Sequence, residues 1–107
     1  MAHYQAVVHY HFKKGREEEG VKFLEKELLQ HAREYGCHDI EICQSERDTS
    51  ELLGLAVWKS IDEAKAFQSQ WIHKEKELLR LCTNPPTREI FKIRSNYVEK
   101  EKSHKIA

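Results

Sequence analysis

The chain has 107 residues, a length that suits one domain with a small core. Its 18 basic residues balance its 18 acidic residues, so no net field favours binding to nucleic acid or to an anionic membrane. Because 34% of the residues are charged and no apolar run approaches the roughly 20 residues of a membrane span, we expect no membrane association.

The N-terminal stretch MAHYQAVVHYHF lacks the basic region, long apolar core and cleavage site of a signal peptide. The cysteine count is odd, and Cys37 and Cys43 fall on one predicted strand, roughly 20 Å apart at strand rise. They cannot form a disulfide along that strand. We therefore expect a reduced, cytoplasmic protein.

The first predicted strand is Tyr4–Phe12, in which two faces alternate. One face is apolar and is expected to lie against helices; it comprises Tyr4, Ala6, Val8, Tyr10 and Phe12. The other is mixed and comprises Gln5, Val7, His9 and His11. Apolar residues at helical spacing, namely Val21, Leu24, Leu28, Ala32 and Tyr35, then predict a helix over Arg16–Tyr35, and Gly36 follows as its C-cap.

Two further strands are predicted at Cys37–Gln44 and Glu51–Trp58, joined by the polar hairpin loop Ser45–Ser50. A sharp strand-to-helix junction comes next. Ser60 and Glu63 have the spacing of a capping box, in which the serine hydroxyl accepts from the backbone N–H of Glu63.

The second helix is predicted from Ile61 to about Leu81, and Trp71–His73 is the candidate position for a break. The residues Asn84-Pro85-Pro86 must end any helix, and the last strand is predicted at Arg88–Tyr97. Residues 1–97 are thus expected to form one domain, followed by a charged tail over 98–107. The expected core residues of the second helix are Ala64, Phe67, Trp71, Leu78, Leu79 and Cys82.

The element order β-α-β-β-α-β predicts an α+β, ferredoxin-like protomer. Right-handed connections place both helices on one face of a four-stranded antiparallel sheet with the strand order 4-1-3-2. The other face is left bare and carries apolar side chains that water does not favour, so we expect two sheets to pair face to face. The residues expected on it are Val7, His9, His11, Asp39, Glu41, Cys43, Leu53, Leu55 and Val57.

Three short segments, in this order and spacing, resemble the antibiotic-biosynthesis-monooxygenase family of dimeric α/β barrels. The first is Lys14-Gly15 before an acidic helix start, the second is Tyr35–Glu41, and the third is Trp58–Ser60 followed by Asp62–Ala64. The resemblance covers about residues 5 to 97. It implies a homodimer whose two sheets form a barrel, with a small-molecule pocket between the sheet and the helices of each protomer.

The family includes cofactor-free oxygenases, so the resemblance implies a cofactor-independent monooxygenase that acts on a small aromatic substrate such as a quinol. The alternative is a non-catalytic dimeric protein that binds a small ligand, with haem among the candidates. The residues expected to bind the substrate are Val8, Tyr10, Trp58, Phe67 and Trp71, and His73 is the candidate general base.

Four of these residues, Trp58, Phe67, Trp71 and His73, also have a purely structural interpretation. Phe67 and Trp71 are spaced as ordinary core residues, and His73 is then exposed. Trp58 is then a packing residue whose indole N–H finds a backbone partner.

The haem-degrading branch of the family is not expected here. Its strand asparagine falls on Val8, its helix aromatic falls on Phe67 rather than tryptophan, and its histidine falls near Glu77.

The pair His9-x-His11 has metal-ligand spacing, and Asp39, Glu41 or Cys43 could add ligands. The interpretation we favour is that these are polar residues of the sheet-to-sheet interface, so no metal site is predicted. RNA binding is also not expected, because Leu53–Val57 offers no aromatic side chain on which a base could stack.

Overall fold

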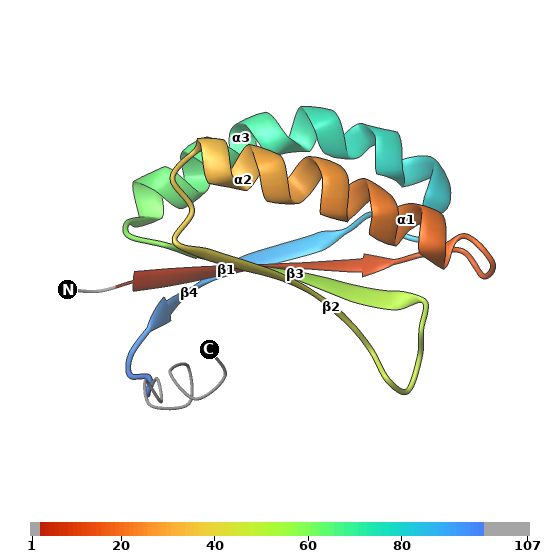
Figure 1. Ribbon diagram of the computed structural model, residues 1–107, viewed down its shortest axis with the longest axis horizontal. Coiled ribbons are helices and arrows are strands. Elements are labelled where there is room, and N and C mark those ends of the chain that lie inside the picture. Colours follow the sequence, from red (N-terminus) through yellow and green to blue (C-terminus); the bar gives the residue numbers. More distant parts are fainter. Residues whose placement is uncertain (1–2, 98–107) are drawn as a thin grey trace, which may run out of the picture.

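The computed structural model describes residues 3–97 and consists of a helical layer on one face of a sheet (Figure 1). The predicted tail, 98–107, lies outside the described residues. The strands are β1 (His3–His11), β2 (Asp39–Gln44), β3 (Glu51–Trp58) and β4 (Thr87–Ile93). The helical segments are α1 (Glu17–Phe23), η1 (Leu24–Leu28), α2 (Leu29–Glu34), α3 (Ile61–Glu75) and η2 (Lys76–Leu81).

The four strands form one antiparallel sheet in the order β2-β3-β1-β4, which confirms the predicted topology. The two inner strands pair with Ala6 opposite Ala56 and Val8 opposite Gly54. Every second residue is buried under the helices along β3 and from Ala6 to Tyr10 on β1, as the alternation of the sequence predicts, whereas Tyr4 is only partly buried. The core therefore lies between the sheet and the helices.

The first helix is continuous from Glu17 to Glu34, but its middle turn, η1, has π-helical hydrogen bonding. Leu24 and Leu28 of this turn are buried. Gly36 ends the helix with a φ of +82°, a conformation that glycine adopts without steric cost. Tyr35, expected in the core, is instead 40% exposed, and its ring meets that of Phe67 in an edge-type contact with centroids 5.6 Å apart.

The junction between β3 and α3 forms as predicted. Ser60 is the N-cap, and its hydroxyl accepts a hydrogen bond of 3.1 Å from the backbone N–H of Glu63. Asp62 and Glu63 place negative charge in the first turn, where the helix dipole favours it.

The second helix departs from the prediction at its C-terminal half. It does not break at Trp71–His73; it stays α-helical to Glu75 and then tightens into the 3₁₀ segment η2. A 3₁₀ helix turns about 120° per residue, so Leu78 and Leu81, three residues apart, share the buried face. The prediction that Leu79 is a core residue is therefore wrong, because Leu79 is 43% exposed.

The second sheet face carries no helix in the part of the chain that the structure describes (Figure 1). The strand register places on it the residues predicted there, together with Phe91, which is 47% exposed. The hairpin loop between β2 and β3 extends below this face (Figure 1). Within residues 3–97, no helix has both the length and the apolar character that crossing a membrane requires.

Candidate ligand cavity between the sheet and the helices

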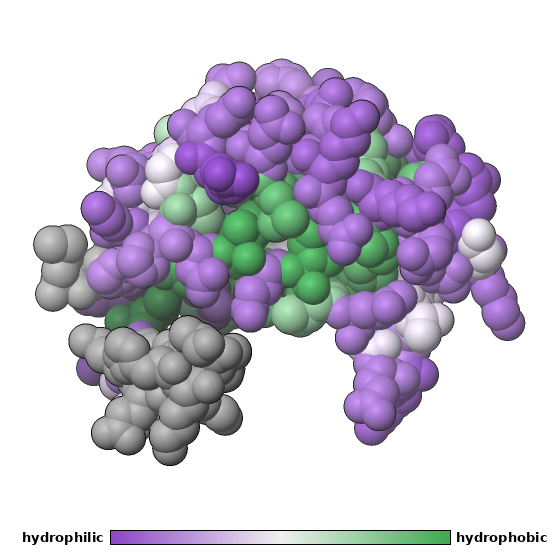
Figure 2. Space-filling view, in the orientation of Figure 1, coloured by the Kyte–Doolittle hydropathy of each residue, from purple (hydrophilic) through white to green (hydrophobic). Residues whose placement is uncertain are grey.

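A small cavity of about 20 Å³ lies between the central strands and the two helices. Figure 2 shows hydrophobic side chains in the region between the hydrophilic outer surface of the helices and the sheet. The cavity is lined by Ala6, Val8, Leu28, Ile40, Gly54, Ala56, Trp58, Phe67, Gln68 and Trp71. Glycine and alanine on the strands leave space beneath the helices, because their side chains are too short to fill it.

Two of the lining residues present N–H groups that have no partner among the described residues. They are the indole Nε1 of Trp58 and the amide Nε2 of Gln68, and both atoms are buried. The expectation that the indole N–H of Trp58 finds a backbone partner is therefore not met. A buried donor without a partner costs about 1–3 kcal/mol, so a ligand oxygen that accepted from these groups would recover that free energy.

Aromatic rings form one wall of the cavity. The Phe67 ring lies 5.1 Å from Trp58 and 6.1 Å from Trp71, measured between ring centroids. The planes of Phe67 and Trp71 are within 11° of parallel. The lining of the cavity thus combines flat apolar surfaces with residues that carry two N–H donors, which suits a flat ligand that carries an oxygen atom.

A buried polar network lies behind this wall. The Tyr10 hydroxyl donates to a Glu75 carboxylate oxygen at 2.9 Å, and the Trp71 indole N–H donates to the same oxygen at 3.1 Å. The other oxygen of Glu75 pairs with the Arg88 guanidinium. The network joins β1, α3 and β4 and fixes the Trp71 ring that borders the cavity.

Burial raises the pKa of Tyr10 well above its usual value, and the negative charge of Glu75 adds to this shift. Tyr10 therefore stays protonated and acts as a hydrogen-bond donor at neutral pH.

Arg88 also has one buried nitrogen, Nη1, without a partner among the described residues. Its other terminal nitrogen, Nη2, forms an ion pair with Glu75, so the Arg88 side chain connects the network to the edge strand β4.

Most of the predicted substrate-binding residues meet at this cavity. Val8, Trp58, Phe67 and Trp71 all line it. Tyr10 does not line it but supports it, since its hydroxyl lies 3.2 Å from the Trp71 indole nitrogen.

His73, the candidate base, does not join these residues. It lies two positions beyond Trp71, about 200° around the α3 helix, and is exposed. The structure thus gives the predicted base no contact with the cavity, and none of the residues that line the cavity is titratable.

Three polar residues of this region were not predicted, namely Gln68, Glu75 and Arg88. Glu75 had a detectable signal, because it follows Trp71 by one helical turn on the face that carries Phe67 and Leu78. Arg88 falls opposite Val8 in the register, on the helix-covered face of β4. Gln68 gave no signal, since it is a polar residue beside the apolar stripe.

No family model and no curated protein sequence matches the chain. Solved structures do match. SnoaB, a cofactor-independent oxygenase from Streptomyces nogalater, has a TM-score of 0.76 and 16% identity, over 91% of this chain and 98% of that chain. The ActVA-Orf6 monooxygenase of Streptomyces coelicolor, solved with nanaomycin D, has a TM-score of 0.71 and 16% identity, over 90% and 91%.

A third structure is a Nitrosomonas europaea protein assigned as an antibiotic biosynthesis monooxygenase. It has a TM-score of 0.76 and 18% identity, over 86% of this chain and 90% of that chain. The resemblance noted in the sequence is therefore confirmed as a likeness of fold. Identities of this size establish the fold alone.

Proposed function

We propose that this chain is a cofactor-independent monooxygenase that binds a small aromatic substrate between its sheet and its helices. The observation that carries the proposal is the cavity with two buried donors, Trp58 Nε1 and Gln68 Nε2, that have no partner in the described part of the chain. A phenolic or quinone oxygen is an acceptor for both N–H groups, and the ring of the same ligand would stack on Phe67. Structures with this fold include oxygenases, and one of them holds an aromatic compound.

The substrate itself supplies the electrons for the reaction. A quinol that reacts with O₂ gains one oxygen atom on its ring and becomes a hydroxyquinone. The second oxygen atom leaves as water with two hydrogen atoms of the quinol. Donors aimed at the substrate oxygen would stabilise the negative charge that develops there as electrons pass to O₂.

Ligand entry requires the helices to move. The cavity of about 20 Å³ holds one water molecule, whereas pockets for drug-sized ligands measure about 300–1,000 Å³. Leu28, which lines the cavity, is the last residue of the π-helical segment η1. Segments of this kind occur often at functional sites, and η1 is the element we expect to yield.

A specific observation also favours the second candidate function, a non-catalytic protein that binds a small ligand. The cavity lining contains no acid or base to move a proton, and His73 faces solvent. In this case the same donors and the same aromatic wall would hold a ligand without turnover.

We further propose that the open sheet face forms a homodimer. Leu53, Leu55 and Phe91 lie on it, and a second copy of the same face would cover them. Gel filtration at low micromolar concentration should give twice the mass of one chain. A stable monomer would contradict the predicted barrel.

That the protein is reduced and cytoplasmic also stays a prediction. Its three cysteines are free thiols in the structure.

The function is tested with a panel of quinols under ¹⁸O₂. Oxygen consumption and product mass should reveal a hydroxyquinone that carries one labelled oxygen atom. Trp58→Phe and Gln68→Leu should each weaken substrate binding about 3- to 10-fold, the equivalent of one neutral hydrogen bond. Gln70→Leu is the matched control, because Gln70 is exposed on the same helix.

Three outcomes separate the candidates. Turnover that falls in the Trp58 and Gln68 variants supports the oxygenase. Tight binding of an aromatic ligand without oxygen uptake supports the binding protein and overturns the oxygenase. If no member of the panel binds, or if Gln70→Leu weakens binding as much as Gln68→Leu does, this cavity is not the site.

A further inference from the structure

Two histidines and a glutamate converge on the open sheet face, opposite to the cavity. His9, His11 and Glu51 each offer one ligand atom, and these atoms all lie within 4.8 Å of one another. His9 Nε2 is 2.9 Å from Glu51 Oε1, and the centroids of the two imidazole rings are 4.3 Å apart. This is the only group of three or more potential metal ligands with this proximity among residues 3–97.

The backbone brings the three residues together in a fixed arrangement. His9 and His11 lie two positions apart on β1 and share a face, and Glu51 pairs directly with His11 across to β3. The end of β1 is held from both sides, because the backbone N–H of Thr83 donates to the carbonyl of His11 at 2.9 Å and that of Phe12 donates to Ser50 at 2.8 Å. Rigid strands position ligands more precisely than loops do.

We propose that His9, His11 and Glu51 bind one divalent transition-metal ion of the Zn²⁺ type. Two imidazole nitrogens and one carboxylate oxygen form a donor set that Zn²⁺ accepts, with a fourth position free for water or another ligand. Imidazole ligands favour Zn²⁺, Cu²⁺ or Ni²⁺ over Mg²⁺ and Ca²⁺, which take oxygen ligands.

The side chains need only a small adjustment to reach coordination geometry. Tetrahedral Zn²⁺ with bonds of 2.0–2.1 Å needs ligand atoms about 3.3 Å apart. His9 and Glu51 are each 34% exposed and already in contact, so rotation of partly exposed side chains can close the remaining distance. The ion would take the place of the direct contact between His9 Nε2 and Glu51 Oε1.

The other ligands that the sequence suggested do not take part. Asp39, Glu41 and Cys43 are on β2, beyond β3, and adjacent strands are about 5 Å apart. Their place is taken by Glu51, which no spacing rule in the sequence connects to His9 and His11. The site lies on the face opposite to the cavity, so its failure or success is independent of the proposed oxygenase.

The experiment is a competition titration of Zn²⁺ between the full chain and a chromophoric chelator, after metal removal. One equivalent of Zn²⁺ per chain should bind. His11→Ala and Glu51→Gln should each weaken binding by more than about 100-fold, because loss of a mere supporting contact at a metal site already costs about 10- to 100-fold. Co²⁺ should give the visible absorption of a four-coordinate site in the native chain but not in His11→Ala or Glu51→Gln.

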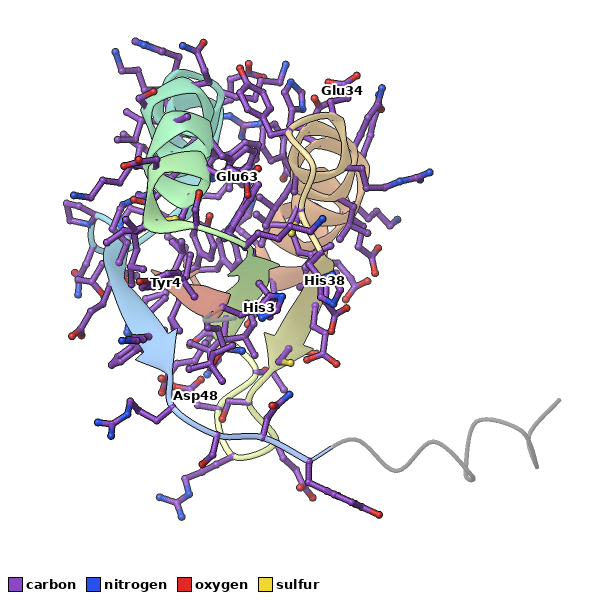
Figure 3. The ribbon with its side chains drawn as sticks, turned by 90° about the vertical axis from the view of Figure 1, so that its left-hand side faces the viewer. His3, Tyr4, Glu34, His38, Asp48 and Glu63 are labelled. Atoms are coloured by element: carbon purple, nitrogen blue, oxygen red, sulfur yellow. The ribbon has the colours of Figure 1, made fainter. Side chains whose placement is uncertain are left out.

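His38→Ala is the matched control. His38 and His3 form another imidazole pair, with ring centroids 5.3 Å apart, and Figure 3 shows both residues at one end of the sheet. This variant should bind Zn²⁺ as the native chain does.

The proposal is overturned if the native chain binds less than one equivalent, or if His11→Ala and Glu51→Gln bind as tightly as the native chain. Loss of binding in His38→Ala alone would also overturn it. Circular dichroism of each variant checks that the fold is intact, so that lost binding reports on the ligands. The interpretation of His9 and His11 as interface residues without metal corresponds to these negative results.

Discussion

At the scale of single residues, Glu75 is the one charged side chain that is buried among the described residues. A buried carboxylate is tolerated only when partners replace its hydration, and Glu75 has three, namely Tyr10, Trp71 and Arg88. Trp58 has the opposite character, because its buried N–H has no partner within residues 3–97. Glu75 therefore stabilises the fold, whereas the indole N–H of Trp58 is available to a ligand.

The hydroxyl of Tyr10 should contribute to stability in a way that depends on pH. Burial raises its folded-state pKa above the unfolded value, so the contribution is complete below about pH 10 and is lost as the pH rises further. Tyr10→Phe should lower the free energy of unfolding by about 1.5–3 kcal/mol at neutral pH, because a hydrogen bond to a charged group is lost. It should also flatten the alkaline decline measured by urea unfolding.

Tyr35→Phe is the control for this prediction, because Tyr35 is 40% exposed. It should retain both the neutral stability and the alkaline decline. An alkaline decline of equal slope in Tyr10→Phe would show that Tyr10 is not its source.

At the scale of elements, the second helix shows what a sequence pattern can and cannot predict. The cap at Ser60 and the buried positions Ala64, Phe67 and Trp71 follow from local rules, and they are confirmed. The change to 3₁₀ winding after Glu75 does not, because it depends on how the chain must turn to enter β4. A constant helical period therefore placed Leu79 inside and missed Leu81.

The winding of η2 can be tested with a pair of substitutions. Leu81→Ala should lower the free energy of unfolding by about 2–5 kcal/mol, since Leu81 is 1% exposed. Leu79→Ala should change it by less than about 0.5 kcal/mol. Equal losses in the two variants would contradict the 3₁₀ assignment.

The contact between the first helix and the end of β1 depends on the absence of a side chain at Gly20. A Cβ atom at this position would lie 2.4 Å from the Phe12 ring, which is itself buried. Gly20→Ala gains about 1 kcal/mol of helix propensity but overpacks the core. We expect the free energy of unfolding to fall by about 1–3 kcal/mol, as measured by thermal unfolding.

Phe12→Leu provides the background for this test, because it removes the ring that the new methyl group would meet. Gly20→Ala should cost less in that background than in the native chain. If the two losses are equal, Gly20 is constrained by something other than Phe12.

At the scale of the whole molecule, the fold was predictable, and the lining of the candidate cavity was predictable in part. The order of elements and the alternation of β1 and β3 determine the topology, and Val8, Trp58, Phe67 and Trp71 do meet at the cavity. Glu51 and Arg88 were not predictable as partners of His9 and Glu75, because strand register brings them together over long separations in the chain. His73 was predicted at the pocket because it is close to Trp71 in the sequence, but the helical phase places it on the exposed side of α3.

Cys43 provides a chemical test of the proposed homodimer. Its thiol is exposed on the open sheet face, opposite Leu53 in the register, and a second copy would cover it. With a thiol reagent in excess, the rate of Cys43 modification should fall as the protein concentration rises. Cys37→Ser and Cys82→Ser in the same chain remove the other two thiols, whose pKa values burial raises.

A rate independent of protein concentration, from the nanomolar to the high micromolar range, would contradict a reversible dimer through this face.

Binding of a ligand at the cavity lined by Trp58 and Gln68 should also be measurable as a change in the stability of the protein. A molecule that binds only the folded chain at 100 times its dissociation constant adds about 2.7 kcal/mol to the free energy of unfolding. In a domain of this size, each kilocalorie raises the melting temperature by about 4–8 °C. A melting-temperature screen of aromatic carbonyl and hydroxyl compounds can therefore identify the ligand without any assumption about turnover.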